Sequence, residues 1–200
     1  MSFLETSIYA LLWVGFGVVH SVLASTSAKR ILHPLFGRYY RLSYNLFSAL
    51  HIGLILLAGR EWLGDNSAHL NLASQLDITI VACRWVGIGI IWAALTQYDL
   101  GLFGGLTQLR RGSNSSIDEK SLHVTGLHRY VRHPLYLGAY CYLWGGAADE
   151  FGLQTAFWGS LYLFVGTWFE ERKLISMYGR YYVEYREKVP AILPIRGRAI

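Results

Sequence analysis

The densest group of polar side chains lies in the stretch LHVTGLHRYVRHPLYLGAY, where Arg132, His133 and Pro134 open an apolar helix. Proline suits the first turn of a helix because its missing N–H is not needed there. The free N–H groups and positive dipole end of a helix start favour an anionic ligand group, and arginine adds a fork for a carboxylate. The pattern indicates either an anion-binding helix start or basic residues that only fix the topology of a membrane span.

Two adjacent carboxylates, Glu170 and Glu171, end another long apolar stretch. Carboxylates at a membrane exit are costly without a partner, so they indicate either a cationic ligand group or a solvated helix end beside Arg172 and Lys173. The turn GGAADEFG separates the two apolar stretches and favours a helical hairpin. In such a hairpin Arg132 and the two glutamates reach the same rim, which predicts a pocket for a zwitterion such as an amino-acid moiety.

Other polar residues give weaker signals. His123, His128 and His133 recur every five residues, which does not align them on one helix face, and no carboxylate or cysteine completes a metal site, so we predict no metal. His20 and His51, inside apolar stretches, are interpreted as hydrogen-bonding partners between helices. The sequence contains no G-x-G-x-x-G after a strand, no Walker A motif and no nucleophile elbow around a serine.

The elements that position these residues are apolar helices. Hydrophobic residues make up 53% of the chain and charged residues 16%, whereas soluble domains average about a quarter charged. This composition excludes a disordered chain. Since a helix needs about 20 apolar residues to cross the hydrocarbon core, five windows with at most one charged residue predict five spans, the fourth short enough to be re-entrant: 6–28, 42–59, 78–98, 135–148 and 151–169.

The basic residues indicate how these spans lie in the membrane. Of the 18 Lys and Arg residues, 16 fall in the segments 25–41, 99–134 and 170–200, whereas Arg60 lies in an opposite loop and Arg84 lies within a span. Because cytoplasmic loops are enriched in Lys and Arg, we expect a membrane protein with its N-terminus outside and its C-terminus in the cytoplasm. The net charge of +5 then reflects topology, and no nucleic-acid partner is expected.

The segment after residue 169, EERKLISMYGRYYVEYREKV, predicts an amphipathic helix on the membrane or folded back against it. Its apolar side chains recur at helical spacings: Leu174, Ile175, Tyr178, Tyr182 and Tyr185. The sequence as a whole therefore predicts an all-α polytopic membrane protein of one domain. Residues 1–98 hold three spans, and residues 99–200 hold the binding region, the helical hairpin and the C-terminal helix.

The segments GLHRYVRHPLYLG and FEERKLISMYGRYYVEYREKVPAILP together resemble the signature of the integral-membrane methyltransferases, which include the isoprenylcysteine carboxyl and phospholipid methyltransferases. The pieces HSVLAS, YRLSYNLFS and YDLGLFGGLTQLR are more similar to the bacterial methanethiol S-methyltransferase and NnrU-like branches. The resemblance implies S-adenosylmethionine as the cofactor, bound at the cytoplasmic rim. The zwitterionic methionine end of that cofactor agrees with the pocket expected from the residues.

The resemblance also implies residue roles. His128, His133 and Arg132 are the candidates for promoting the thiolate that a thiol acceptor must become. His128 stands where the family usually has tyrosine, and FVGTWFEE lacks the arginine that isoprenylcysteine enzymes carry before the acidic pair, which argues against prenylcysteine esterification. The implied cofactor-binding residues are Gln108, Gly126, Tyr130, Arg132, His133, Pro134, Tyr136, Gly138, Glu170 and Glu171.

We therefore expect a membrane methyltransferase that transfers a methyl group from S-adenosylmethionine to a small or lipophilic acceptor. The leading acceptor is a thiol such as methanethiol, and membrane lipids are the expected surroundings. One alternative is methylation of a prenylcysteine carboxylate or of a phospholipid. An alternative of another class is a non-catalytic, NnrU-like membrane module.

Overall fold

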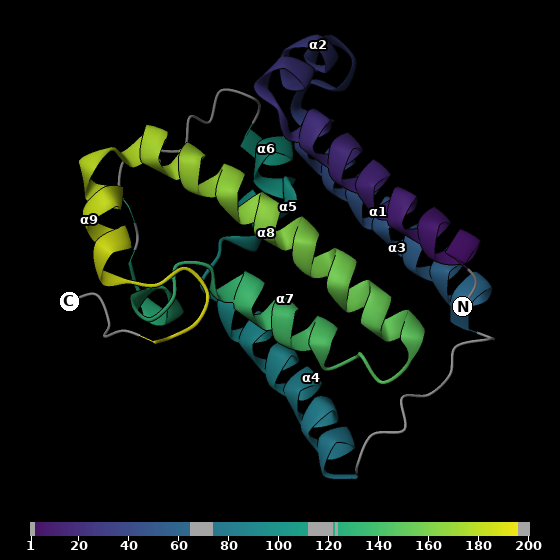
Figure 1. Cartoon of the computed structure of the whole chain (residues 1–200). Helices are drawn as coiled ribbons and strands as arrows, with labels where there is room; N and C mark the ends of the chain where they lie inside the picture. The colour runs from purple at the N-terminus through teal and green to yellow at the C-terminus, as the bar shows by residue number, and fades with distance from the viewer. Residues whose placement is uncertain (1–2, 65–73, 112–121, 123, 196–200) are drawn as a thin grey trace. The chain divides into compact units, whose positions relative to one another are not determined.

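In the computed structural model, which describes residues 3–64, 74–111, 122 and 124–195, every regular element is a helix, as predicted (Figure 1). The helices form two compact units. The first unit contains α1 (Phe3–Ala24), α2 (Thr26–Phe36), η1 (Gly37–Tyr39), α3 (Tyr40–Gly59), η2 (Arg60–Gly64), α5 (Leu100–Gly104) and α6 (Leu106–Arg111). The second contains α4 (Ser74–Leu95), η3 (Gly126–Arg129), α7 (Pro134–Trp144), α8 (Glu150–Tyr178) and α9 (Arg180–Lys188).

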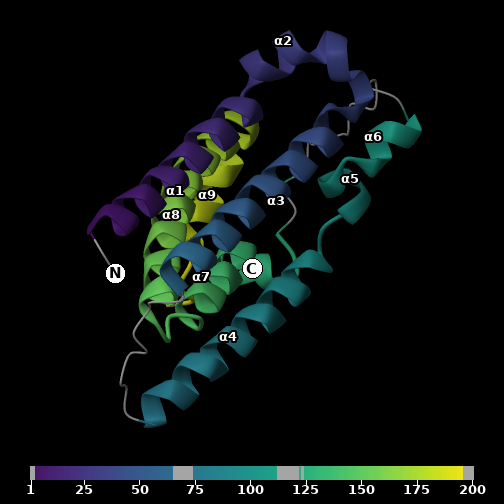
Figure 2. The same ribbon diagram turned by 90° about the vertical axis from the view of Figure 1, so that its right-hand side faces the viewer.

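In the first unit α1 and α3 lie side by side in both views (Figures 1 and 2). Aromatic side chains of α1, including Tyr9 and Trp13, are buried in this unit. His20 of α1 contacts α3 through its ring nitrogens, which lie 3.1 Å from Oγ of Ser48 and 2.7 Å from the hydroxyl of Tyr44. The prediction that His20 is a hydrogen-bonding partner between helices is therefore confirmed.

The short helix α2 connects α1 to α3. It begins at Ser25, whose side chain accepts a hydrogen bond from the N–H of Ala28 at 3.2 Å. It ends at Gly37, whose φ of +47° is one that residues with a side chain rarely adopt. Figure 2 shows α2 running across the ends of α1 and α3 at a steep angle to both.

In the second unit α7 packs against α4 on one side and α8 on the other. Glycine makes the close contact between α7 and α4 possible. A Cβ atom on Gly138 would lie 2.9 Å from the backbone nitrogen of Ile91 and 3.0 Å from the carbonyl oxygen of Gly87. Side chains at these two glycines would push the helices apart. The close contact fixes the position of α7, whose first residue is next to the candidate site.

Three helical stretches are long and apolar enough to cross a membrane: Phe3–Ala24, Thr26–Leu63, which contains α3, and Leu76–Leu95 in α4. They correspond to the first three predicted spans. The fourth predicted span forms α7, whose 11 residues reach about 16 Å, roughly half of the 30 Å hydrocarbon core. The fifth lies in α8, which has 29 residues but includes the charged segment after residue 169.

The predicted amphipathic helix after residue 169 is helical but divided. The chain continues α8 as far as Tyr178, turns at Gly179 with a φ of +57° and enters α9. One face of α9 packs against the protein itself. Tyr182 and Tyr185, with Val189 just after the helix, form a buried cluster, against which Leu122, Val124, Leu174, Ile175 and Tyr178 pack. This cluster holds α9 against the end of α8 and brings Tyr182 next to Glu171.

Candidate active site

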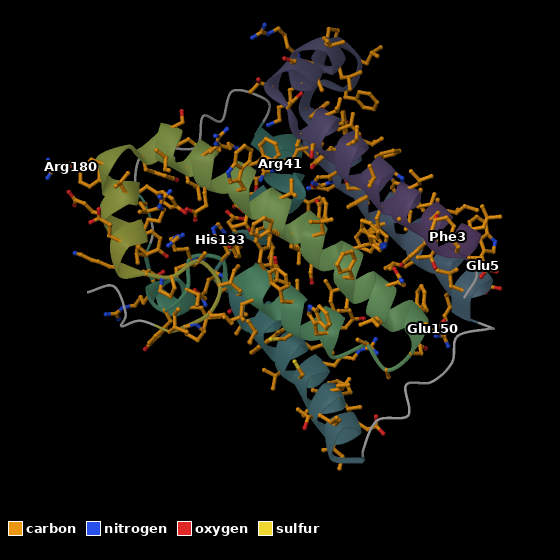
Figure 3. All side chains as sticks on the ribbon, in the orientation of Figure 1. Phe3, Glu5, Arg41, His133, Glu150 and Arg180 are labelled. Carbon is orange, nitrogen blue, oxygen red and sulfur yellow. The ribbon has the colours of Figure 1, made fainter. Side chains whose placement is uncertain are left out.

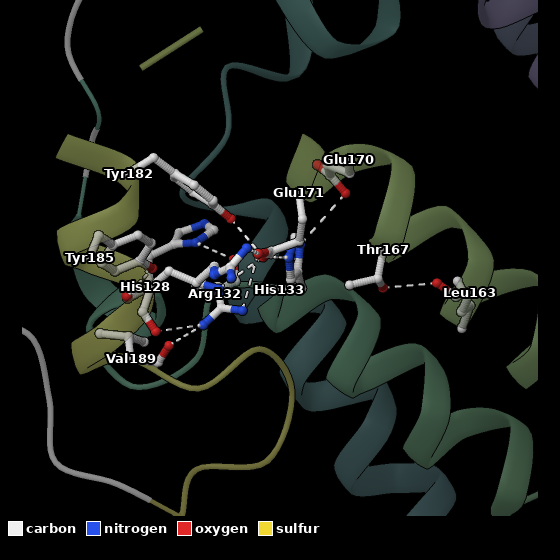
Figure 4. Close-up of polar contacts among 11 residues, drawn as sticks. His128, Arg132, His133, Leu163, Thr167, Glu170, Glu171, Tyr182, Tyr185 and Val189 are labelled. Atoms are coloured by element: carbon white, nitrogen blue, oxygen red, sulfur yellow. Dashed lines mark hydrogen bonds and ion pairs between the residues drawn. The ribbon is translucent and has the colours of Figure 1, made fainter. Parts of the chain in front are cut away.

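The carboxylate of Glu171 is the centre of a polar cluster that joins α7, α8 and α9 (Figure 4). Its Oε1 atom accepts hydrogen bonds from Nε of Arg132 at 2.9 Å, from Nε2 of His133 at 2.7 Å and from the hydroxyl of Tyr182 at 2.7 Å. Its Oε2 atom accepts from Nη2 of Arg132 at 3.2 Å. Glu171 is only 9% exposed, so these donors replace the water that a surface carboxylate would bind.

The donors determine the charge of this carboxylate. Burial alone would raise the pKa of Glu171, but the hydrogen bonds from His133, Arg132 and Tyr182 and the charge of Arg132 outweigh it and lower the pKa to about 2. Burial and the hydrogen bond to the carboxylate raise the pKa of the Tyr182 hydroxyl. Glu171 is therefore an anion at neutral pH, whereas Tyr182 stays protonated and donates to it.

The side chain of Arg132 is held entirely by partners within the second unit. Besides the two bonds to Glu171, its Nη1 atom donates to the carbonyl oxygen of Arg186 at 3.1 Å and to that of Val189. Its backbone N–H donates a hydrogen bond to the carbonyl oxygen of Pro190 at 2.9 Å. In the folded chain the carboxylate that this arginine binds is that of Glu171, so Arg132 joins the start of α7 to α8.

His133 lies between the two adjacent carboxylates. Because the ionised Glu171 can only accept a hydrogen bond, Nε2 of His133 carries the proton. The other ring nitrogen, Nδ1, lies 3.6 Å from Oε2 of Glu170. The ring is 5% exposed and stacks on Tyr136 at a centroid distance of 5.4 Å, whereas the side chain of Glu170 is 42% exposed. Glu170 is therefore the accessible carboxylate of the pair.

The turn before α7 positions these groups. Nδ1 of His128 donates to the carbonyl oxygen of Arg132 at 3.1 Å, and the hydroxyl of Tyr185 donates to the carbonyl oxygen of His128 at 2.5 Å. Burial lowers the pKa of His128, so its ring is neutral at pH 7. Gln97, just after α4, accepts from the N–H of Leu127 at 3.1 Å. Gly126 has a φ of +54°, which residues with a side chain rarely adopt, and this explains the glycine.

The structure brings together His128, Arg132, His133, Glu170 and Glu171 in one unit. Figure 3 shows His133 at one end of the α7 and α8 pair and Glu150 at the opposite end of α8. The other predicted residues are placed as follows: Pro134 and Tyr136 lie in the first turn of α7, Gly138 faces α4, Tyr130 is 45% exposed after η3, and Gln108 lies on α6 of the other unit with its side chain outside the described part.

Two residues of the cluster were not predicted as site residues. Tyr182 was noted only for its helical spacing, and that spacing does indicate that it faces the protein. Gln97 follows the third span with no pattern around it that marks a contact 30 residues away. The carbonyl oxygens that bind Arg132 carry no signal in the sequence, because every residue has one. In the described residues, no three side chains of His, Cys, Asp or Glu are grouped as metal ligands.

The chain is similar over most of its length to known enzymes. It is 30% identical over 184 residues to methanethiol S-methyltransferase 2 of Bradyrhizobium diazoefficiens, covering 90% of this chain and 69% of that protein. The chain belongs to the methanethiol S-methyltransferase family. Members from Pseudomonas deceptionensis and Crocosphaera subtropica are 27% and 26% identical, with 90% and 92% of this chain and 69% and 72% of theirs aligned.

Membership of the methanethiol S-methyltransferase family confirms the resemblance found in the sequence. No family model matches the chain, and no solved structure matches it. Together with the three apolar stretches, the family identifies a membrane protein.

Proposed function

We propose that this protein is an S-adenosylmethionine-dependent methyltransferase whose acceptor is methanethiol. The observation that supports this most is the Glu171 cluster. It joins Arg132 and His133 of the first signature segment to Glu170 and Glu171 of the second, with hydrogen bonds across 38 and 39 residues of sequence. Relatives named methanethiol S-methyltransferase align with about 90% of the chain.

The residues of the cluster suit this cofactor. Glu170 offers a half-exposed carboxylate to the ammonium group of a methionine moiety, and Tyr136 and Tyr130 offer aromatic faces to a sulfonium. When bound, S-adenosylmethionine would supply a methyl group whose bond to a positively charged sulfur breaks as a thiolate attacks the methyl carbon, with S-adenosylhomocysteine as the leaving group. We assign Glu170 to cofactor binding, and we assign Arg132 and Glu171 to fixing the start of α7 beside it.

His133 is the residue we assign to the proton of the thiol. Its Nε2–H is tied to Glu171 at 2.7 Å, which leaves Nδ1, on the side of Glu170, as the basic nitrogen. A proton taken up at Nδ1 makes an imidazolium between two carboxylates, which stabilise its charge. This is the arrangement of a carboxylate that orients a histidine base. The Nδ1–H of His128 donates to a neutral carbonyl oxygen, which stabilises an imidazolium less than the carboxylate that His133 binds, so we assign the proton to His133.

The proposed setting is a bacterial inner membrane with five crossings or partial crossings. α7 and the apolar part of α8 are the fourth and fifth, with α7 penetrating only part of the core. The basic segments then face the cytoplasm and the N-terminus faces outside. In this orientation the Glu171 cluster lies at the cytoplasmic rim, where the cofactor is available.

The test is methyl transfer by the purified full chain in detergent micelles, with cofactor labelled in its methyl group. With methanethiol we expect labelled dimethyl sulfide in the headspace. Parallel reactions with a prenylcysteine and with phospholipid separate a base-labile ester and a methylated lipid from the sulfide. Cofactor binding without any methanethiol turnover would contradict the acceptor, and no cofactor binding would contradict the enzyme assignment.

Substitution of Glu170 tests the cofactor site. Glu170→Gln should raise the cofactor KM by about tenfold or more, because a hydrogen bond to a charged group contributes about 1.5–3 kcal/mol. The matched control is Glu184→Gln, which removes a carboxylate from an exposed ion pair with Arg180 on α9 and should leave the KM unchanged. Equal effects of the two variants would remove Glu170 from the site.

Substitution of His133 tests the base. His133→Gln keeps an N–H for Glu171 but has no basic nitrogen, so kcat at neutral pH should fall by about 10²–10⁴-fold. As pH rises the thiol ionises in solution, and the variant should recover toward the rate of the native enzyme. A variant whose rate stays in constant proportion to the native rate across this pH range would show that His133 does not accept the proton.

A further inference from the structure

Helix α2 carries an apolar face that the described residues leave open. Ile31 and Leu35, one helical turn apart, are 73% and 79% exposed, and Phe36 beside them is 41% exposed. Residues four apart lie on the same face of a helix. Ala28 and Leu32, on the flank of that face, are partly buried within the protein. Within the described residues, the outer part of this face, formed by Ile31 and Leu35, is left uncovered.

The opposite face of α2 is basic. It carries Lys29, Arg30 and His33, and Arg38 and Arg41 follow just after the helix. No Asp or Glu occurs anywhere from residue 6 to residue 60. A helix with a basic face, an apolar face and no acidic residue in the surrounding stretch is complementary to a surface that is apolar below and anionic above.

The orientation of α2 matches such a surface. The Ser25 cap at its start and the positive φ of Gly37 at its end separate it from α1 and α3, and it runs across the ends of both (Figure 2). The stretches that contain α1 and α3 are long and apolar enough to cross a membrane. A helix that crosses the ends of two spanning helices lies along the membrane surface.

We propose that α2 is an interfacial helix that binds anionic lipid headgroups. Ile31, Leu35 and Phe36 lie among the upper acyl chains, and Arg30 and Lys29 lie at the level of the phosphates, which the length of their side chains allows. The partner is the anionic leaflet of the bilayer and not a soluble protein. The proposal is independent of the methyl-transfer reaction, because it concerns the first unit alone.

The experiment places a fluorescent label on α2 in the full chain, reconstituted in lipid nanodiscs. In a background with Cys83→Ala and Cys141→Ala, bimane is attached at Leu35→Cys or at His33→Cys. We expect lipids brominated on the acyl chain to quench the label at 35, and aqueous iodide to quench the label at 33. Equal quenching of both labels by iodide, or loss of the difference between the two positions, would overturn the interfacial placement.

The headgroup is tested with the label at 35 and brominated phosphatidylglycerol or phosphatidylcholine at equal fractions. Quenching should favour phosphatidylglycerol, and Arg30→Gln should reduce that preference by up to about fivefold, the effect expected for one basic residue at an anionic surface. Arg60→Gln, at the opposite end of α3, is the matched control and should leave the preference unchanged. No preference in the native chain, or equal loss in both variants, would overturn the lipid assignment.

Discussion

The two units hold polar side chains inside them in different ways. In the first unit His20, Tyr44 and Ser48 form a neutral hydrogen-bonded group between α1 and α3. In the second unit an ionised glutamate is surrounded by an arginine, a histidine and a tyrosine. Burying a charge costs far more than burying a neutral group, so it requires several donors at once. The comparison shows which contacts join helices and which maintain a charged site.

The largest difference between the units should appear when the charged cluster loses its arginine. Arg132→Leu leaves Glu171 short of two donors and leaves the carbonyl oxygens of Val189 and Arg186 without their donor. Breaking a buried ion pair by removing one partner costs about 3–5 kcal/mol. We expect a loss of this size in the free energy of unfolding in mixed micelles, accompanied by loss of activity.

The control for Arg132 is Arg186→Gln. Its Nη1 atom lies 3.9 Å from Oε2 of Glu171 and its side chain is 49% exposed, so this ion pair should contribute less than about 1 kcal/mol. Similar losses of stability in both variants would mean that charge near Glu171, and not the hydrogen-bonded geometry of Arg132, stabilises the cluster.

Acid should destabilise the second unit through the same carboxylate. The pKa of Glu171 is lowered from 4.5 to about 2 in the folded chain, so the unfolded chain binds a proton more readily. The stabilisation is therefore complete above about pH 4.5 and is lost as the pH falls through 2. Thermal unfolding followed by circular dichroism should show a falling melting temperature over this range. Glu171→Gln, which has no carboxyl group to titrate, should show a flatter pH dependence.

The contact between α4 and α7 should respond to a single methyl group. A Cβ atom at Gly87 would lie 2.7 Å from the carbonyl oxygen of Gly138 and even closer to the backbone nitrogen of Tyr142, and backbone atoms cannot easily move away. Gly87→Ala should therefore cost about 1–3 kcal/mol. The control is Gly89→Ala on the same helix, where no atom lies within 4 Å of the added methyl and little loss is expected. Equal free energies of unfolding for the two variants would show that α4 and α7 can move apart at Gly87 without loss of stability.

The smallest effect is expected in the first unit. His20→Phe keeps an aromatic ring at this position but removes the ring nitrogens that contact Tyr44 and Ser48. Hydrogen bonds between membrane helices contribute about 0.6 kcal/mol on average. Unfolding of the variant should shift by about this amount, and methyl transfer should be unchanged. A loss as large as that of Arg132→Leu would contradict the distinction between the two units.

Much of the fold could be predicted because lipid imposes a strong pattern on sequence. The first three spans appear as long stretches with at most one charged residue, and the structure forms helices there. The turn predicted at GGAADEFG agrees with the end of α7 at Trp144, but the sequence does not show that Gly145 lies so close to Arg84 that a Cβ atom there would collide with its backbone. The break at Gly179 was also missed, because the apolar spacing continues across it from Tyr178 to Tyr182.

The sequence indicates which residues belong to the candidate site, but it does not indicate which of them bind one another. Arg132, His133, Glu170 and Glu171 stand out because charged residues at the ends of apolar helices need partners. The sequence left open whether Arg132 binds a ligand or only fixes topology, and it did not predict that this arginine binds Glu171 and two backbone carbonyl oxygens of the chain. Which charges satisfy one another depends on the distance between helix ends, and spacing along one chain does not encode that distance.

The partners of Arg132 also determine when the candidate site can form during synthesis of the chain. During synthesis the arginine leaves the ribosome well before Glu171, which follows 39 residues later, and before Val189, which follows 57 residues later. Until those residues emerge, the side chain of Arg132 has none of the contacts described for it. A chain interrupted before Val189 should therefore remain a substrate for membrane proteases instead of becoming a partly active enzyme, and completion of the site coincides with completion of translation through this segment.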